Sequence, residues 1–260
     1  MVQTERVHYS GLSGAHALLQ QGLPVFTYHK IARRPWKAKW RSLYLSPRDF
    51  DRQMRELAEA GYTTARLSEP RPRCFNPKRK FAITFDDGYQ SVAKHAAPVL
   101  RKYGFTAIQF IVAGELGGTN RWDVAEGEVP APLMDAAQIR AWLEAGHEIG
   151  SHTLSHPRLS RLSPAALREE VRASKSRLED TFGVAIRHFC YPYGDYDERV
   201  VAEVARAGYE TACTHLQSGV SVAATPPHEL RRIEARYPKR NFRLLLARLL
   251  RGPRQLGISS

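Results

Sequence analysis

Short apolar runs that favour β-strands alternate with helical segments along this 260-residue chain. The runs at 81–85 and 106–112 carry the Phe, Ile, Val and Thr side chains that are typical of strands. Apolar residues at helical spacing predict helices at 46–60, 92–103, 135–145, 164–182 and 200–207. Because strands that alternate with helices form parallel sheets, the sequence predicts an α/β fold. The chain length suits a single catalytic domain with a well-buried core.

Two of the apolar runs end in residues suited to chemistry. The run at 81–85 stops at Asp86, Asp87 and Gly88, and a second apolar segment runs into His152 and His156, which are four residues apart. Alone, each pattern is weak, because Asp and Gly are common in turns and surface histidines often have this spacing. Together they are expected to meet if both lie at the same ends of neighbouring strands of an α/β fold.

A divalent metal explains this combination. Two histidines at i and i+4 lie on one face of a helical turn, and two imidazoles with one carboxylate make a three-ligand site. Such a site leaves positions open for water and substrate. A metal lowers the pKa of water to roughly 7, and the second carboxylate can accept the proton that water releases. The pattern therefore predicts hydrolysis of an amide or an ester.

Three motifs in order resemble those of the polysaccharide deacetylases, which have a NodB homology domain and form carbohydrate esterase family 4. They lie at 84–88, 146–156 and 189–194. The resemblance spans roughly residues 24 to 236 and implies a distorted (β/α) barrel of about seven strands. It divides the chain into an N-terminal extension at 1–23, a catalytic domain at 24–237 and a basic amphipathic tail at 238–260.

The resemblance also implies roles for individual residues. Asp86 would be the catalytic base. Asp87, His152 and His156 would bind one divalent metal ion, zinc in the first place, with cobalt, nickel or iron as alternatives. The backbone N–H of Tyr193 would stabilise the oxyanion of the reaction. The implied activity is removal of N-acetyl groups from an amino sugar, with release of acetate.

The chain departs from the family pattern at two points. Cys190 stands where an arginine usually orients the catalytic aspartate, and the candidates to replace that arginine are Arg187, Arg231 and Arg232. The Leu-x-His motif that usually supplies the general acid near the C-terminus is also missing.

Another histidine must therefore protonate the departing amine. His29 follows Tyr28 in a motif that resembles the subgroup with poly-N-acetylglucosamine deacetylases, where the acid comes from the N-terminal side. An imidazole with a pKa near 6.5 can donate a proton at neutral pH. His29 is the predicted acid, and His228 is the alternative.

Aromatic residues flank the motifs and could contact the apolar faces of sugar rings. Trp122 is the first candidate, because it lies in a Gly-rich, acidic excursion at 114–132 that we expect on the substrate side. Tyr191 is the second. Core packing is the competing role for each, and for the other aromatics near the motifs, which are Trp36, Trp40, Tyr44 and Tyr196.

The formal net charge of +13 implies attraction to an anionic surface. No nucleic-acid motif appears, so nucleic acid is not an expected partner. The segment at 239–251 mixes leucines with arginines at near-helical spacing, which suits either a helix at a membrane surface or a terminal helix packed on the barrel.

Residues 1–20 lack the pattern of a secretory signal, and the three cysteines are scattered without a disulfide framework. These features predict a cytoplasmic protein, with peripheral contact at the inner face of the membrane if the tail binds lipid. The expected substrate is then a soluble or lipid-linked glycan. Two other functions stay open: a glycan-binding relative without turnover, and a basic adaptor at a membrane or nucleic-acid surface.

Overall fold

The computed structural model describes residues 8–9, 23–67, 79–215 and 226–236. Most of the predicted N-terminal extension and all of the predicted tail lie outside these residues. The strands are β1 (His8–Tyr9), β2 (Val25–Tyr28), β3 (Lys30–Ile31), β4 (Tyr44–Leu45), β5 (Thr63–Thr64), β6 (Lys80–Phe85), β7 (Ile108–Ile111), β8 (Glu148–Ser151), β9 (His188–Cys190), β10 (Thr211–His215) and β11 (Leu230–Ala235).

The α-helices are α2 (Pro47–Glu59), α3 (Ala97–Tyr103), α4 (Arg121–Val124), α5 (Ala136–Glu144), α6 (Pro164–Phe182) and α7 (Glu198–Arg206). Single 3₁₀ turns are η1 (Arg41–Leu43), η3 (Ala113–Glu115), η4 (Leu159–Arg161), η5 (Pro192–Gly194) and η6 (Pro227–Glu229), and η2 (Val92–Ala96) is π-helical. Among the helices that the structure describes, none combines the length and the apolar character needed to cross a membrane.

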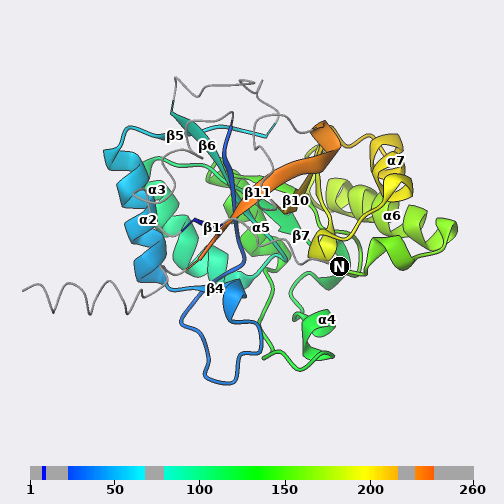
Figure 1. Ribbon diagram of the computed structural model, residues 1–260, viewed down its shortest axis with the longest axis horizontal. Helices are drawn as coiled ribbons and strands as arrows, with labels where there is room; N and C mark the ends of the chain where they lie inside the picture. The colour runs from blue at the N-terminus through cyan, green and yellow to red at the C-terminus, as the bar shows by residue number, and fades with distance from the viewer. Residues whose placement is uncertain (1–7, 10–22, 68–78, 216–225, 237–260) are drawn as a thin grey trace, which may run out of the picture.

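Seven parallel strands close into a barrel, in the order β2-β6-β7-β8-β9-β10-β11 and back to β2. This arrangement confirms the predicted α/β barrel. In Figure 1, α2 and α3 flank one side of the barrel and α6 and α7 the other, while β11 crosses the centre of the view. Two short strands pair with barrel strands in parallel: β1 pairs with β11, and β5 pairs with β6.

The alternation of side chains along β6 explains how the barrel presents the acidic motif. Phe81, Ile83 and Phe85 are buried in the main apolar cluster, where Phe85 meets Trp142 of α5 edge to face. The intervening residues point into the barrel, since successive side chains of a strand alternate between its two faces. Asp86 follows Ala82 and Thr84 on that inner face, so the strand delivers it to the mouth of the barrel.

Most predicted helices appear with boundaries shifted by one or two residues. Helix α6 has the predicted range, because the Ser163 side chain caps its start and Gly183 ends it in the left-handed conformation. The predicted helix at 92–103 is wrong in detail. Its first turn is the π-helical η2, next to Pro98, which has no N–H to donate to the carbonyl four residues earlier. The excursion at 114–132 contains the short helix α4.

Candidate active site

A pocket of about 300 Å³ opens at the carboxyl ends of the barrel strands. Most of the predicted site residues line it because they directly follow the strands: His29 follows β2, the acidic pair follows β6, and His152 follows β8. The pocket lining includes Asp86, Asp87, His152, His156, His29 and Tyr193. Parallel strands bring these residues together, since their carboxyl ends all meet at one end of the barrel.

Asp86 is held by an arginine from the opposite side of the barrel. Arg232 on β11 donates from Nη1 to Asp86 Oδ1 at 2.7 Å and from Nη2 to Oδ2 at 2.8 Å. The Thr27 hydroxyl donates to Oδ2 at 3.3 Å. Burial alone would raise the pKa of Asp86, but the charge and hydrogen bonds of Arg232 outweigh it and hold the pKa well below its usual range. Asp86 is therefore an ionised proton acceptor at neutral pH.

Of the three arginines proposed to replace the family arginine, only Arg232 reaches Asp86. Arg187 instead pairs with Glu210 at 3.6 Å on the surface. Cys190 occupies the family arginine's position in the motif, and its thiol lies 3.0 Å from Arg232 Nη2. A small side chain at this position leaves room for a guanidinium that enters from β11.

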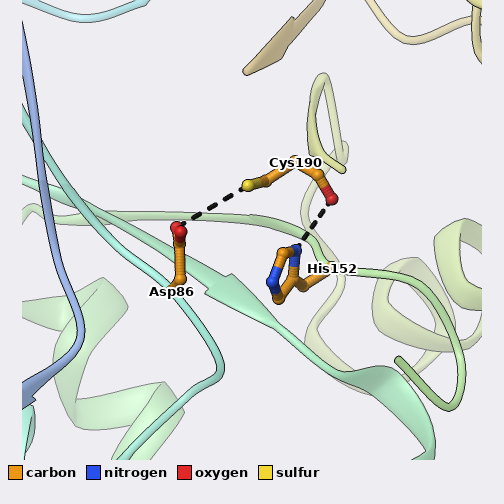
Figure 2. Close-up of side chains that lie close together, drawn as sticks. All are labelled: Asp86, His152 and Cys190. Atoms are coloured by element: carbon orange, nitrogen blue, oxygen red, sulfur yellow. Dashed lines mark hydrogen bonds between the residues drawn. The ribbon is translucent and has the colours of Figure 1, made fainter. Parts of the chain in front are cut away.

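Cys190 also joins the base to the metal-ligand candidates, as Figure 2 shows. Its thiol lies 3.7 Å from Asp86 Oδ1, and its backbone carbonyl lies 2.8 Å from His152 Nδ1. A histidine whose Nδ1–H donates to a carbonyl presents Nε2 as the free nitrogen. The backbone of β9 thus aims His152 Nε2 away from Cys190 and toward Asp87.

Asp87, His152 and His156 form a buried group with the donors of a metal centre. Nε2 of each histidine lies 3.3 Å from Asp87 Oδ1. Two ligands that each lie about 2.1 Å from a tetrahedral zinc are about 3.4 Å apart, so the observed spacing fits such an ion. Burial lowers the pKa of His156 to about 4, which leaves its ring neutral at pH 7, as metal binding requires.

A second group of candidate ligands, Asp86, His152 and Cys190, lies equally close together. The Arg232 guanidinium already donates to both the carboxylate and the sulfur. Burial also raises the pKa of the Cys190 thiol well above its usual range, so the thiol remains protonated. A fixed positive charge and a protonated thiol oppose a cation here, which leaves the Asp87 group as the candidate metal centre.

Two expectations about residues 152–156, called the ligand loop here because they include His152 and His156, were wrong. The histidines do not lie on a helical turn, because the chain after β8 is irregular and Thr153 and His156 have φ of 70° and 67°. Such backbone costs on the order of 1–3 kcal/mol per residue and persists only where surrounding contacts hold it. The two motif strands are also not neighbours, since β7 lies between β6 and β8.

Tyr193 lies in the turn after β9 and has a φ of 60°. Its backbone N–H donates to no acceptor within the described part of the chain, so this donor is available to a ligand in the pocket. Its ring packs edge-on against His156, with centroids 4.6 Å apart, and lies under the Arg158 guanidinium at 4.2 Å. These contacts fix the turn beside the candidate metal centre.

The two candidate acids occupy different places. His29 lines the pocket, and its Nε2 lies 3.6 Å from Asp86 Oδ2. His228 is not in the pocket lining; its Nε2 lies 2.8 Å from the Tyr209 carbonyl, and its own carbonyl accepts a hydrogen bond from Tyr191. The geometry therefore favours His29 for proton transfer to a substrate.

The aromatic candidates differ in a similar way. Tyr191 lines the pocket, stacked on Tyr196 with ring centroids 4.7 Å apart. Trp122 stacks on His156, with centroids 4.5 Å apart and planes 23° apart, and it does not line the pocket in this conformation. Trp122 thus packs directly against a candidate metal ligand, and its contact with a sugar stays a prediction.

Sequence reasoning missed several polar residues of the pocket, among them Asp123, Arg158 and His215. Asp123 neighbours Trp122, and Arg158 lies two residues after His156, so nearness to a motif could have indicated both. His215 ends β10, where no motif marks it. The His215 ring can pack against the turn after β9 because residue 194 is glycine: a Cβ on Gly194 would lie 2.5 Å from this ring.

Fold and site together define the protein as an α/β barrel with a candidate active site at the carboxyl ends of its strands. The more particular assignment comes from its sequence: the family model for polysaccharide deacetylases matches residues 75–212, more than half of the chain. The chain belongs to that family.

Comparison with individual proteins agrees with this assignment. YxkH of Bacillus subtilis is 28% identical over 196 residues, which cover 74% of this chain and 64% of that protein. A poly-β-1,6-N-acetyl-D-glucosamine N-deacetylase of Staphylococcus aureus is 27% identical over 135 residues, covering 51% of this chain and 46% of the relative. The chain thus spans less than two thirds of the length of these relatives.

Solved structures share the fold. The Streptococcus pyogenes deacetylase PplD, in complex with acetate, superposes with a TM-score of 0.69 at 22% identity, over 87% of this chain and 98% of that one. IcaB from Ammonifex degensii gives a TM-score of 0.67 at 22% identity, over 87% and 96% of the two chains. At this level of identity the likeness supports the barrel architecture alone.

Proposed function

We propose that the protein is a metal-dependent hydrolase that removes N-acetyl groups from an amino sugar within a glycan and releases acetate. One observation carries the proposal: a single pocket combines an ionised carboxylate held by Arg232 with a separate group of three metal-binding donors. Amide hydrolysis needs both a proton acceptor and an electrophilic centre, and these two groups supply them side by side.

Asp87, His152 and His156 would hold the metal. When bound, a divalent ion such as zinc polarises the acetyl carbonyl and makes water a stronger acid. The His152 ring is already aimed by the Cys190 carbonyl, and His156 is fixed between Trp122 and Tyr193. Zinc is the ion that the donor set favours, with cobalt, nickel or iron as alternatives.

The other residues handle protons and charge. Asp86 accepts the proton of the attacking water, and Arg232 keeps this carboxylate ionised and oriented. The Tyr193 N–H donates to the developing oxyanion, an interaction typically worth about 2.7–4 kcal/mol. His29 donates a proton to the nitrogen as the C–N bond breaks, so the sugar amine leaves as a neutral group.

An N-acetylated amino sugar is the proposed substrate class, because the relatives named above include a deacetylase of poly-N-acetylglucosamine. The pocket volume of about 300 Å³ lies at the lower end of the range for ligand sites, which suits one sugar unit rather than several. Tyr191 borders the pocket, but only 1% of its surface is exposed, so its contact with a sugar stays a prediction. The sugar can belong to a polysaccharide, an oligosaccharide or a lipid-linked glycan.

Membrane contact through the basic tail and a cytoplasmic location are further proposals, supported by sequence alone. The tail lies outside the described residues. Deleting residues 239–260 should abolish binding to vesicles of anionic phospholipid if the tail is the membrane contact, and unchanged partitioning would refute that contact.

Acetate release is the direct test of the function. Metal-loaded wild type and Asp86→Asn are compared on N-acetylated chito-oligosaccharides, poly-N-acetylglucosamine and a lipid-linked glycan extract, at matched metal occupancy. The proposal predicts release by wild type and a loss of at least about 100-fold in the variant. Glycan binding without release would instead identify a relative that has lost turnover, and salt-sensitive binding to anionic surfaces without either would identify a basic adaptor.

A further inference from the structure

The loop that carries His152 and His156 has a strained backbone, and hydrogen bonds within the loop are not enough to stabilise its conformation. Thr153 and His156 both have positive φ, although neither is glycine, and no regular helix spans the segment. Local bonds account for part of the shape: the His156 N–H donates to Thr153 Oγ1 at 2.9 Å, and the Thr153 N–H to Ser151 Oγ at 3.2 Å. The rest of the restraint must come from elsewhere in the fold.

Glu170 supplies that restraint from helix α6. One of its carboxylate oxygens, Oε2, accepts hydrogen bonds from the Leu154 and Ser155 backbone N–H groups, both at 2.9 Å. The other, Oε1, accepts from the Ser155 hydroxyl at 2.5 Å. Three donors of the loop thus converge on one ionised acceptor, and such charge-assisted bonds are the stronger kind.

The opposite side of the loop is closed by the segment after β7. The Gly114 N–H donates to the Leu154 carbonyl at 2.8 Å, and the Ala113 N–H to the Thr153 carbonyl at 3.0 Å. A Cβ on Gly114 would lie 2.4 Å from the Leu154 carbonyl oxygen, so the approach is as close as backbone allows. Leu154 and Ser155 lie midway between the two histidines, and hydrogen bonds to Gly114 on one side and Glu170 on the other therefore hold this part of the loop in place.

We propose that Glu170 is a positioning residue that holds the loop of His152 and His156 in its metal-binding shape and thereby sets the affinity for the metal. This inference rests on the metal centre of the proposed function. When a loop is disordered before binding, the free-energy cost of ordering it weakens the net binding of the metal. A loop that is already held in its binding shape avoids this cost and binds the metal more tightly. Glu170 is not in the pocket lining and has no hydrogen bond to the three metal donors, so it acts through its bonds to the Leu154 and Ser155 backbone and to the Ser155 hydroxyl.

The test measures zinc affinity of the apoprotein by competition with a chelator, without substrate. Glu170→Ala should weaken zinc binding by about 10- to 100-fold, the usual range when a group that orients metal ligands is removed. Glu169→Ala is the matched control, because Glu169 is the exposed neighbour on the same helix and should bind zinc as wild type does. Glu170→Gln, which keeps an acceptor for the two backbone N–H groups, should give an intermediate affinity.

Two readouts separate this role from a merely structural one. The melting temperature of the apoprotein should change little in Glu170→Ala, and saturating zinc should restore most of the acetate release. A lower melting temperature with unchanged zinc affinity would overturn the inference. Gly114→Ala provides a second route, since it pushes on Leu154 from the other side and should also weaken zinc binding.

Failure of the inference can be told from failure of the proposed function. If wild type binds zinc through Asp87 but releases no acetate, the deacetylase proposal fails while the affinity comparison still decides the role of Glu170. If Asp87→Ala leaves zinc binding intact, the metal lies elsewhere and the inference is overturned as well.

Discussion

Arg232 shows how much of this site depends on one long-range contact between side chains. It lies inside the barrel with 1% of its surface exposed, and it satisfies its donors with Asp86, Thr84 Oγ1, the Thr214 carbonyl and the Cys190 sulfur. Its pairing with Asp86 is bidentate, which fixes the orientation of the carboxylate as well as its charge. The proposed catalytic base is therefore positioned by a residue that no motif marks.

Replacing Arg232 with Met should remove most of the proposed deacetylase activity. The Asp86 carboxylate would remain buried without its partner, which typically destabilises a protein by about 3–5 kcal/mol, and a misplaced base commonly lowers kcat/KM by about 100-fold or more. Urea unfolding and acetate release measure the two effects. Arg231→Met is the control, because Arg231 is the partly exposed neighbour on the same strand; equal effects of both variants would contradict the assignment.

Gly194→Ala should impair turnover through the turn that presents the Tyr193 N–H. Gly194 has a φ of 64°, and a Cβ there would lie 2.5 Å from the His215 ring, so the turn must shift. Loss of one oxyanion donor costs roughly 10²–10³ in kcat. Gly183→Ala is the control, because Gly183 has a similar backbone conformation, with a φ of 68°, but no atom lies within 4 Å of an added Cβ. We expect normal kcat in that control, and normal kcat in Gly194→Ala would remove the turn from the mechanism.

At the scale of elements, two loops beside the pocket are joined by a buried ion pair. Lys30 on β3 lies 3.7 Å from Glu128, and its ammonium also faces the rings of Tyr44 and Tyr89, each at 4.7 Å. Glu128 accepts further hydrogen bonds from the Tyr44 hydroxyl and the Trp40 N–H, both at 2.8 Å. The excursion at 114–132 is thereby fixed to the segment around η1, and together they form one wall of the pocket.

Glu128→Ala should therefore be strongly destabilising. Burial lowers the pKa of Lys30, and removing Glu128 takes away the main charge that opposes this effect. An unpaired buried charge costs about 3–5 kcal/mol, whereas the double change with Lys30→Met should cost clearly less than the sum of the two single changes. Chemical unfolding of the four proteins gives the coupling energy. Glu59→Ala, which removes an exposed pair with Arg55, should stay within about 1 kcal/mol of wild type.

Local sequence predicted the helices well because caps and periodicity act over a few residues. Ser46, Asp135 and Ser163 each accept a hydrogen bond from the N–H three residues on, and the observed helices begin next to them. The ligand loop was not predictable in this way. Its left-handed residues are held by Gly114 and Glu170, which are distant in sequence, and local spacing alone favoured a helical turn that the structure does not contain.

At the scale of the whole molecule, burial makes stability depend on pH. His147 is buried against Trp142 and its Nδ1 accepts the Ala107 N–H at 3.3 Å. Burial lowers the pKa of His147 to about 4, below the value of about 6.5 expected in the unfolded chain. Between these two values the unfolded state binds more protons, so the contribution of His147 is complete above about pH 6.5 and is lost as the pH falls toward 4.

His147→Gln should accordingly flatten the pH dependence of unfolding. Without His147, one proton fewer is taken up on unfolding. The slope of the free energy of unfolding against pH should therefore fall by at most about 1.4 kcal/mol per pH unit between pH 6.5 and 4. Urea titrations of wild type and variant at several pH values measure the difference, and comparing the two proteins removes the contribution of other titrating groups. Parallel curves would show that the buried ring does not titrate in this range.

The sequence by itself determined the class of fold and the kinds of residue in the site. Alternating strands and helices specify a parallel sheet, which the family resemblance narrows to a barrel. Residues that follow such strands meet at one end of it, so Asp86, Asp87, His152 and His156 converge. Only the tertiary structure decided which arginine holds the base, how the ligand loop turns and which histidine reaches the pocket. These depend on barrel closure, which brings Arg232 to Asp86 across 146 residues of chain, a contact that local periodicity does not encode.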